Sequence, residues 1–133
     1  MKSYEDVYKT AGAFSWTELM TADPKAAQEF YGRLFGWKFD TMNMGQGDYH
    51  VVKTDGTAVG GIMGIPPESQ GMPTAWSAYV TVADADAAVE KCKSLGGKVC
   101  AGPMDVPNVG RFAVLQDPQG AVFNVMAYSP PAN

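Results

Sequence analysis

The sequence predicts an α+β domain built from two tandem βαβββ modules, which together form an eight-stranded mixed sheet with one helix packed per module. The first observation is a tight hairpin connection that occurs twice. Asp117-Pro118-Gln119-Gly120 joins two β-rich runs, and Thr54-Asp55-Gly56 joins an earlier pair. The second is a set of helix-cap and core positions that recur 61 positions later (84 − 23), namely Asp23/Asp84, Ala27/Ala88, Leu34/Leu95 and Gly36/Gly97. A fixed period of this kind indicates an internal duplication.

The first module begins with a strand over Phe14–Thr21, whose alternation places Trp16 and Glu18 on the same face. Asp23-Pro24 then supplies a helix cap and a proline at the first helical position, and Gly36 ends the helix. Helical spacing predicts one buried apolar stripe, made of Ala27, Phe30, Tyr31 and Leu34. Three further strands, the last two joined by the shorter hairpin, complete the module.

The second module repeats this order. Asp84 caps its helix, which is expected to bury Leu95 on its apolar face, and Lys98–Ala101 follows as a strand. Residues 102–110 contain two prolines and are expected to form a loop. The expected boundaries are an N-terminal arm at 1–12, module one at about 13–64, a linker at 65–75, module two at about 76–128 and a tail at 129–133.

Composition narrows the classes of partner. The 133 residues carry 10 Lys and Arg against 14 Asp and Glu, a net charge of −4, and no basic stripe that would indicate a nucleic-acid partner. No apolar run is long enough to cross a bilayer, and the polar start lacks the apolar core of a signal peptide. Cys92 and Cys100 are too few for a disulfide framework. We therefore expect a cytoplasmic protein with no membrane partner.

Two motifs give the sequence a resemblance to a known family. Phe30-Tyr31…Leu34-Phe35-Gly36-Trp37 and Asp117-Pro118-Gln119-Gly120 resemble the glyoxalase / bleomycin-resistance / extradiol-dioxygenase superfamily, also called vicinal oxygen chelate, over residues 13 to 128. The resemblance implies that each module curls into half of a cup and that the two halves close around a small-molecule ligand. It also implies that two chains pair as a homodimer.

Metal-dependent members of that family carry His, Glu or Gln ligands on the first and last strands of each module. Mapped by motif, these positions are Trp16 and Ser77 on the first strands, and Gly60 and Asn124 on the last strands. None of the four is a usual ligand of a divalent metal. We therefore expect no metal or other cofactor, and the alternative is a divalent metal bound by ligands outside these positions.

The resemblance, combined with strand alternation, predicts the lining of the pocket: Trp16, Glu18, Gly60, Ser77, Tyr79, Asn124 and Met126. Glu18 is the candidate catalytic residue, because a carboxylate in an apolar cup can act as a base or bind a donor group. Another reading places Glu18 at the mouth of the cup, hydrated or paired with Arg33 or Lys25. The lining side chains can also fill the cup as core, in which case the pocket is vestigial.

Two functions therefore follow from the sequence, with a plain interaction module as a third. The first is a protein that binds a small, partly apolar molecule without the usual metal-ligand set. The alternative is an enzyme of the lyase, isomerase or dioxygenase type, either metal-free with Glu18 as base or metal-dependent. His50 is the only histidine, so it cannot build a ligand set, and Arg111 at a strand start is a candidate contact for an anionic ligand. The sequence does not identify the ligand.

Overall fold

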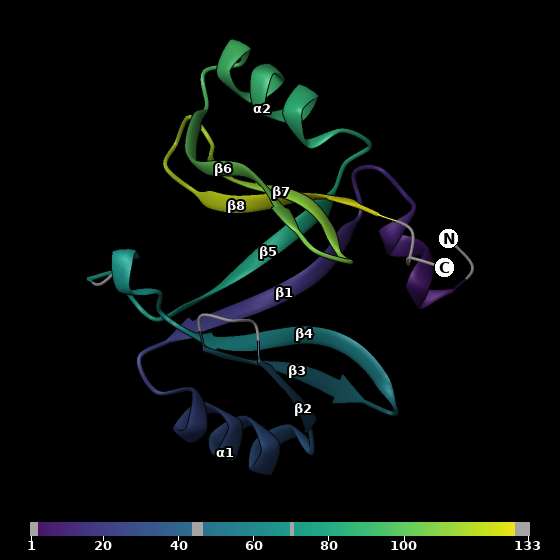
Figure 1. The fold of residues 1–133 in the computed structure, drawn as a ribbon, viewed down its shortest axis with the longest axis vertical. Coiled ribbons are helices and arrows are strands. Elements are labelled where there is room, and N and C mark those ends of the chain that lie inside the picture. The colour runs from purple at the N-terminus through teal and green to yellow at the C-terminus, as the bar shows by residue number, and fades with distance from the viewer. Residues whose placement is uncertain (1–2, 44–46, 70, 130–133) are drawn as a thin grey trace. The chain divides into compact units, whose positions relative to one another are not determined.

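A computed structural model describes residues 3–43, 47–69 and 71–129 (Figure 1). Residues 1–2 of the expected arm, residue 70 of the expected linker and residues 130–133 of the expected tail lie outside this range. The described elements are η1 (Tyr4–Tyr8), β1 (Phe14–Thr21), α1 (Pro24–Phe35), β2 (Lys38–Asn43), β3 (Asp48–Thr54), β4 (Thr57–Gly64), η2 (Pro67–Ser69), β5 (Ala75–Thr81), α2 (Ala85–Ser94), β6 (Lys98–Val106), β7 (Gly110–Gln116) and β8 (Val122–Tyr128).

The strands of the described chain form a mixed, eight-stranded sheet in the order β2-β3-β4-β1-β5-β8-β7-β6. Each module pairs its first and last strands in parallel, β1 with β4 and β5 with β8, and its other neighbours are antiparallel. The predicted α+β class and the two βαβββ modules are therefore confirmed. The chain divides into two compact units, which we call the first-module unit (Trp16–Ser77) and the second-module unit (Met1–Ser15 with Ala78–Asn133).

The core of the first-module unit lies between its sheet and α1. Its buried centre is formed by Leu19, Val52 and Ile62, against which Ala27, Tyr31, Trp37, Phe39 and Val59 pack. The predicted helix stripe is wrong in part, because Phe30 and Leu34 are 60% and 58% exposed. Ala27 and Tyr31 lie one turn apart, so α1 contacts the core along a narrow line instead of a broad face.

The helix ends follow the sequence closely in both modules. The Asp23 carboxylate accepts a hydrogen bond from the Ala26 amide at 3.0 Å, and the Asp84 carboxylate accepts one from the Ala87 amide at 3.1 Å. Each aspartate thereby satisfies one of the amides that an α-helix leaves without an internal partner. Gly36 adopts the left-handed conformation (φ 75°) that ends α1.

The second-module unit buries Val89, Ala113, Leu115 and Val125, with α2 supplying Val89. The sequence prediction for Leu95 is wrong: it is 69% exposed, because it already lies at the C-cap of α2. The predicted loop over 102–110 is wrong in part, since β6 continues to Val106 and only residues 107–109 form a turn before β7. β6 lies at the edge of the sheet and its register shifts between Ala101 and Met104, the setting in which a strand tolerates proline.

The N-terminal segment belongs to the second-module unit. Val7 of η1 is buried, and its carbonyl accepts a hydrogen bond from the Thr81 hydroxyl at 2.6 Å. The rings of Tyr8 and Tyr128 meet edge to face with centroids 4.9 Å apart. Burial and neighbouring phenol groups raise the pKa of Tyr8 to about 12.

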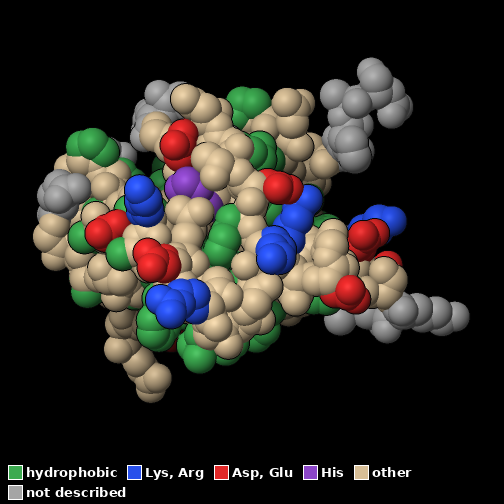
Figure 2. Space-filling view, turned by 90° about the horizontal axis from the view of Figure 1, so that it is seen from below, with side chains coloured by type: hydrophobic (Ala, Val, Ile, Leu, Met, Phe, Trp, Pro, Cys, Tyr) green, Lys and Arg blue, Asp and Glu red, His purple; other side chains and the backbone are tan. Residues whose placement is uncertain are grey.

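The surface mixes charge with apolar groups. On the face shown in Figure 2, Lys and Arg side chains lie among Asp and Glu side chains and hydrophobic ones. Among the helices of the described chain, none has the length and apolar character needed to cross a membrane.

Candidate functional site

The two faces of the first-module sheet differ in chemistry. Leu19 of β1 packs in the core under α1, so its strand neighbour Glu18 points to the opposite face. The parallel pairing of β1 with β4 sets Glu18 beside Gly61 and Thr17 beside Gly60. Glu18 and Gly61 therefore share the face that is turned away from α1, which is where we place the candidate site.

Tyr49 of β3 connects the polar groups of this face. Its hydroxyl donates a hydrogen bond to Glu18 Oε2 at 2.7 Å and accepts one from Trp16 Nε1 at 2.8 Å. Glu18 is only 7% exposed, whereas Trp16 and Tyr49 are half-buried. We call these three side chains the Trp16–Tyr49–Glu18 relay. It satisfies a carboxylate whose burial would otherwise be costly.

Gly61 makes room for the tyrosine. A Cβ placed on Gly61 would lie 1.9 Å from the Tyr49 hydroxyl oxygen and 2.2 Å from the ring carbon that carries it. Any side chain at position 61 would therefore push the Tyr49 ring aside and break its contact with Glu18. Sequence reasoning missed Tyr49, although two consecutive glycines in a strand are a known sign of close approach by another group.

A β-bulge explains why Gly60 lies elsewhere. In β4, Ala58 is opposite Lys53 and Gly60 is opposite Val52, so Val59 is the extra residue. Gly60 consequently lies beside Thr17 on the α1 side of the sheet, away from Glu18. The repeat equates Glu18 with Tyr79, and the strand partner of Tyr79 is Asn124. The first-module equivalent of Asn124 is therefore Gly61, one residue beyond the position obtained by counting from the hairpin.

The second-module unit holds three further predicted lining residues. Tyr79, Asn124 and Met126 are buried on the sheet face opposite α2, because the intervening Val125 packs in the core with α2. The Asn124 amide donates a hydrogen bond to the Ala78 carbonyl at 3.2 Å. The Tyr79 ring lies 6.5 Å, centroid to centroid, from that of Phe112. Ser77 is half-buried and is the last residue of the first-module unit.

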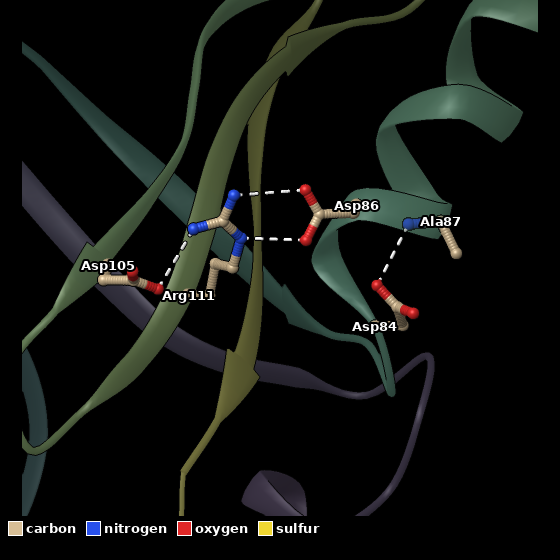
Figure 3. A network of polar contacts seen from close by, with 5 residues as sticks. All are labelled: Asp84, Asp86, Ala87, Asp105 and Arg111. Atoms are coloured by element: carbon tan, nitrogen blue, oxygen red, sulfur yellow. Dashed lines mark hydrogen bonds and ion pairs between the residues drawn. The ribbon is translucent and has the colours of Figure 1, made fainter.

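Arg111 is held by acidic partners in the second-module unit (Figure 3). It contacts both carboxylate oxygens of Asp86, at 2.8 and 3.1 Å, and Asp105 Oδ1 at 3.1 Å. The hydrogen bonds from Arg111 hold the pKa of Asp86 below its ordinary value. Two carboxylates already balance this guanidinium, so the arrangement disfavours Arg111 as a site for an anionic ligand.

The remaining sequence candidates are engaged in local contacts. His50 Nδ1 lies 2.8 Å from the Thr41 hydroxyl across the β2–β3 pair. Arg33 pairs with Glu29 at 3.9 Å within α1, an exposed pair of small energetic weight. Glu18 accepts a hydrogen bond from Tyr49, which supports an inward carboxylate over the reading in which Glu18 pairs with Arg33 or Lys25.

Comparison with known proteins agrees with this architecture. Residues 13–125 match the family described as the Glyoxalase/Bleomycin resistance protein/Dioxygenase superfamily. The chain belongs to this superfamily. The resemblance noted in the sequence is thereby confirmed.

Curated relatives within the superfamily are longer than this chain. It is 43% identical over 120 residues to the protein named "Putative glyoxylase CFP32" of Mycobacterium tuberculosis, covering 90% of this chain and 45% of that protein. It is 35% identical over 127 residues to "Anthracycline biosynthesis protein DnrV" of Streptomyces peucetius, covering 86% of this chain and 46% of that protein. The chain therefore spans less than half the length of these relatives.

Solved structures show the same fold at low identity. The methylmalonyl-CoA epimerase of M. tuberculosis superimposes with a TM-score of 0.62 at 17% identity, covering 91% of this chain and 93% of the epimerase. The hypothetical protein BH1468 of Bacillus halodurans superimposes with a TM-score of 0.67 at 13% identity, covering 93% and 99%. Similarity at this level of identity shows the fold alone.

The donor atoms do not fit the metal site of the superfamily's metal-dependent members. Within the part of the chain that the structure describes, no three His, Cys, Asp or Glu side chains gather as a metal-binding group. Beside Glu18, Gly61 offers no side chain, and the Tyr49 ring occupies the space over it. A divalent metal needs several convergent donors, but on this face Glu18 is bonded to a phenol, and Asp40, three strands away on β2, pairs with Lys53.

Proposed function

We propose that this chain binds a small, partly apolar molecule against the Trp16–Tyr49–Glu18 relay, without a bound metal ion. The buried, hydrogen-bonded carboxylate of Glu18 carries the proposal. An apolar residue would suit the interior of a sheet face better, because burying a carboxylate is costly even with a partner. A ligand that bonds to the carboxylate would explain why a glutamate occupies this buried position.

The relay suggests what the ligand looks like. Trp16 and Tyr49 are more exposed than Glu18, so a ligand would meet two aromatic rings before the carboxylate. Rings of this kind favour a planar or hydrophobic body. Glu18 adds a strong acceptor, so the ligand should carry a hydrogen-bond donor or a positive charge that competes with the Tyr49 hydroxyl.

An enzyme that uses Glu18 as a base is the second candidate, and the same hydrogen bond would fix the orientation of the carboxylate. The Tyr49 hydroxyl stabilises the charged form of the carboxylate, which is the form that accepts a proton. One relative carries the word glyoxylase in its name, and proton removal next to a carbonyl is chemistry that a single carboxylate can perform. The reaction itself is a proposal, because the chain covers less than half of that relative.

The first experiment is a thermal-shift screen of planar and hydrophobic metabolites on the wild type, Glu18→Gln and Tyr49→Phe. Glu29→Gln, an exposed change on α1, is the matched control. For ligands with a donor group, Glu18→Gln should lower affinity by about 10–100-fold, the usual loss for a hydrogen bond to a charged group. An enzyme would instead keep most of its binding and lose about a hundredfold or more in rate.

Two outcomes would contradict the proposal. The first is a ligand whose affinity is the same in the wild type and in both relay variants. The second is a screen without any shift, together with a crystal structure in which the relay is packed over by other side chains.

Elemental analysis tests the metal-free state. Protein purified without a chelator or a metal-affinity tag should contain well below one Zn, Ni, Fe or Mn per chain. Gly61→His with Tyr49→Ala is the comparison variant, because it removes the covering ring and adds a second donor beside Glu18, and its metal content should be no lower than that of the wild type. About one metal per wild-type chain, lost in Glu18→Gln, would overturn this part of the proposal.

A further inference from the structure

A pocket of about 280 Å³ opens on the other face of the first-module sheet. Its lining consists of Thr17, Trp37, Val52, Val59, Gly60 and Trp76. Thr17 lies between Trp16 and Glu18 in β1, so its side chain points away from the relay. We propose that this pocket is a second binding site, independent of the relay, for a small neutral ring compound that carries one hydrogen-bonding group.

The β-bulge creates the space. As the extra residue of β4, Val59 joins the packing on the α1 side, where it contacts the buried core. Gly60 follows it without a side chain, and a Cβ there would lie 2.5 Å from the Thr17 carbonyl oxygen. At Gly60 the pocket is therefore lined by backbone alone. A strand without the bulge would not leave this space.

Two tryptophans form a fixed wall. Trp76 is 37% exposed, yet its Nε1 donates a hydrogen bond to the Tyr31 hydroxyl at 3.1 Å. Its ring lies 6.0 Å from that of Trp37 at 81°, and 5.3 Å from that of Tyr31 at 76°. With its N–H group engaged, Trp76 presents an apolar surface, and a ring already held in place loses little entropy when a ligand binds.

The lining specifies the chemistry of the ligand. None of the six residues carries a charge, so the pocket disfavours ions. The structure shows no hydrogen bond from the exposed Thr17 hydroxyl to another described residue, which leaves one donor and acceptor for a ligand. The pocket is open to solvent at Thr17 and Trp76, and its volume of about 280 Å³ has room for one ring with a substituent.

Phenol and toluene form the test pair, because they have similar size and differ in the hydroxyl. Titration of ¹⁵N-labelled protein is followed at the indole N–H signals of the three tryptophans, assigned with Trp→Phe variants. We expect both compounds to shift the signals of Trp37 and Trp76, and a shift at Trp16 reports binding at the relay instead. A ligand of this size should bind with a Kd of about 1 mM.

Variants then locate the site. Val59→Phe should fill the pocket and weaken both compounds by about tenfold or more. Thr17→Val keeps the shape and should weaken phenol by about 3–10-fold while leaving toluene unchanged. Glu18→Gln is the control that separates this site from the relay, and it should bind both compounds as the wild type does. If Val59→Phe does not fold, Trp76→Leu replaces it as the test variant. It removes the exposed aromatic wall of the pocket and should also weaken both compounds.

Several results would overturn the proposal. They are the absence of any shift at Trp37 and Trp76 up to the solubility limit, unchanged affinity in both Val59→Phe and Trp76→Leu, and loss of binding in Glu18→Gln. The first two outcomes leave the relay proposal untouched, whereas loss of binding in Glu18→Gln would assign the binding of these compounds to the relay.

Discussion

The two modules share their order of elements but use the face of the sheet opposite the helix in different ways. Where the first module has Glu18 beside Gly61, the second has Tyr79 beside Asn124. The first thus places a buried carboxylate next to a bare backbone covered by Tyr49, and the second places two neutral polar side chains next to each other.

The comparison separates what maintains the fold from what is free to diverge. Both helices begin with a capping aspartate, and both sheets bury an aliphatic core beneath the helix. These features recur because each of them stabilises a βαβββ module. The opposite faces differ even in charge, so the two modules of this chain have diverged there.

The largest effect should come from the two cores. Ile62→Ala and Leu115→Ala each remove a fully buried side chain and should lower the free energy of unfolding by about 2–5 kcal/mol. Urea denaturation followed by circular dichroism measures this loss. Leu34→Ala and Leu95→Ala are the controls, and both should stay within about 0.5 kcal/mol because these residues are exposed. Equal losses for buried and exposed leucines would contradict the burial described above.

Gly61→Ala should have the next largest effect. The new methyl group displaces the Tyr49 hydroxyl and leaves Glu18 buried without that donor, which should cost about 1–3 kcal/mol. The same change made in a Tyr49→Ala background should cost much less, because the clash is gone. Denaturation of the four proteins of this double-mutant cycle gives the coupling energy. Purely additive losses would mean that Gly61 does not act through Tyr49.

The helix caps should give equal effects in the two modules. Asp23→Ala and Asp84→Ala each remove one hydrogen bond to a helix amide and should each lower stability by about 1 kcal/mol. The corresponding asparagine variants should retain most of that stability, since asparagine also caps helices. Thermal melts suffice for this comparison. A large loss in one module only would show that the two caps are not equivalent.

The smallest effect on stability concerns the carboxylate of Asp86. Its pKa in the folded chain is depressed by Arg111, so its contribution to stability is complete above the unfolded pKa and is lost as pH falls through the folded value. Carboxyl-carbon NMR titration should place the pKa of Asp86 below its ordinary value. In Arg111→Gln it should return toward that value. An unchanged pKa in the variant would contradict the assignment to Arg111.

The sequence predicted the modules well because their signals are local. A capping aspartate, a closing glycine and a hairpin turn each act within a few residues, and their recurrence at one offset gave the duplication. The exposed Phe30 and Leu34 were not predictable in this way, because helical spacing does not tell how wide a strip of α1 meets the sheet.

The relay was only half predictable. Alternation along β1 placed Trp16 and Glu18 on one face, and in the structure both side chains form hydrogen bonds with the Tyr49 hydroxyl. Tyr49 itself belongs to another strand, and which residue it faces depends on the pairing of β3 with β4. The bulge at Val59 shifts that pairing by one residue, so counting from the hairpin led to Gly60 instead of Gly61.

The bulge also bears on how such a duplicated protein can change. In a regular strand, inserting one residue turns every following side chain to the other face, so a length change would ruin the packing. Here the extra residue is confined to Val59, and the hairpin and the pairing with β1 both remain in register. The two repeats can therefore drift in length as well as in sequence, and an alignment of such copies is more accurate when it follows strand partners than when it preserves residue counts.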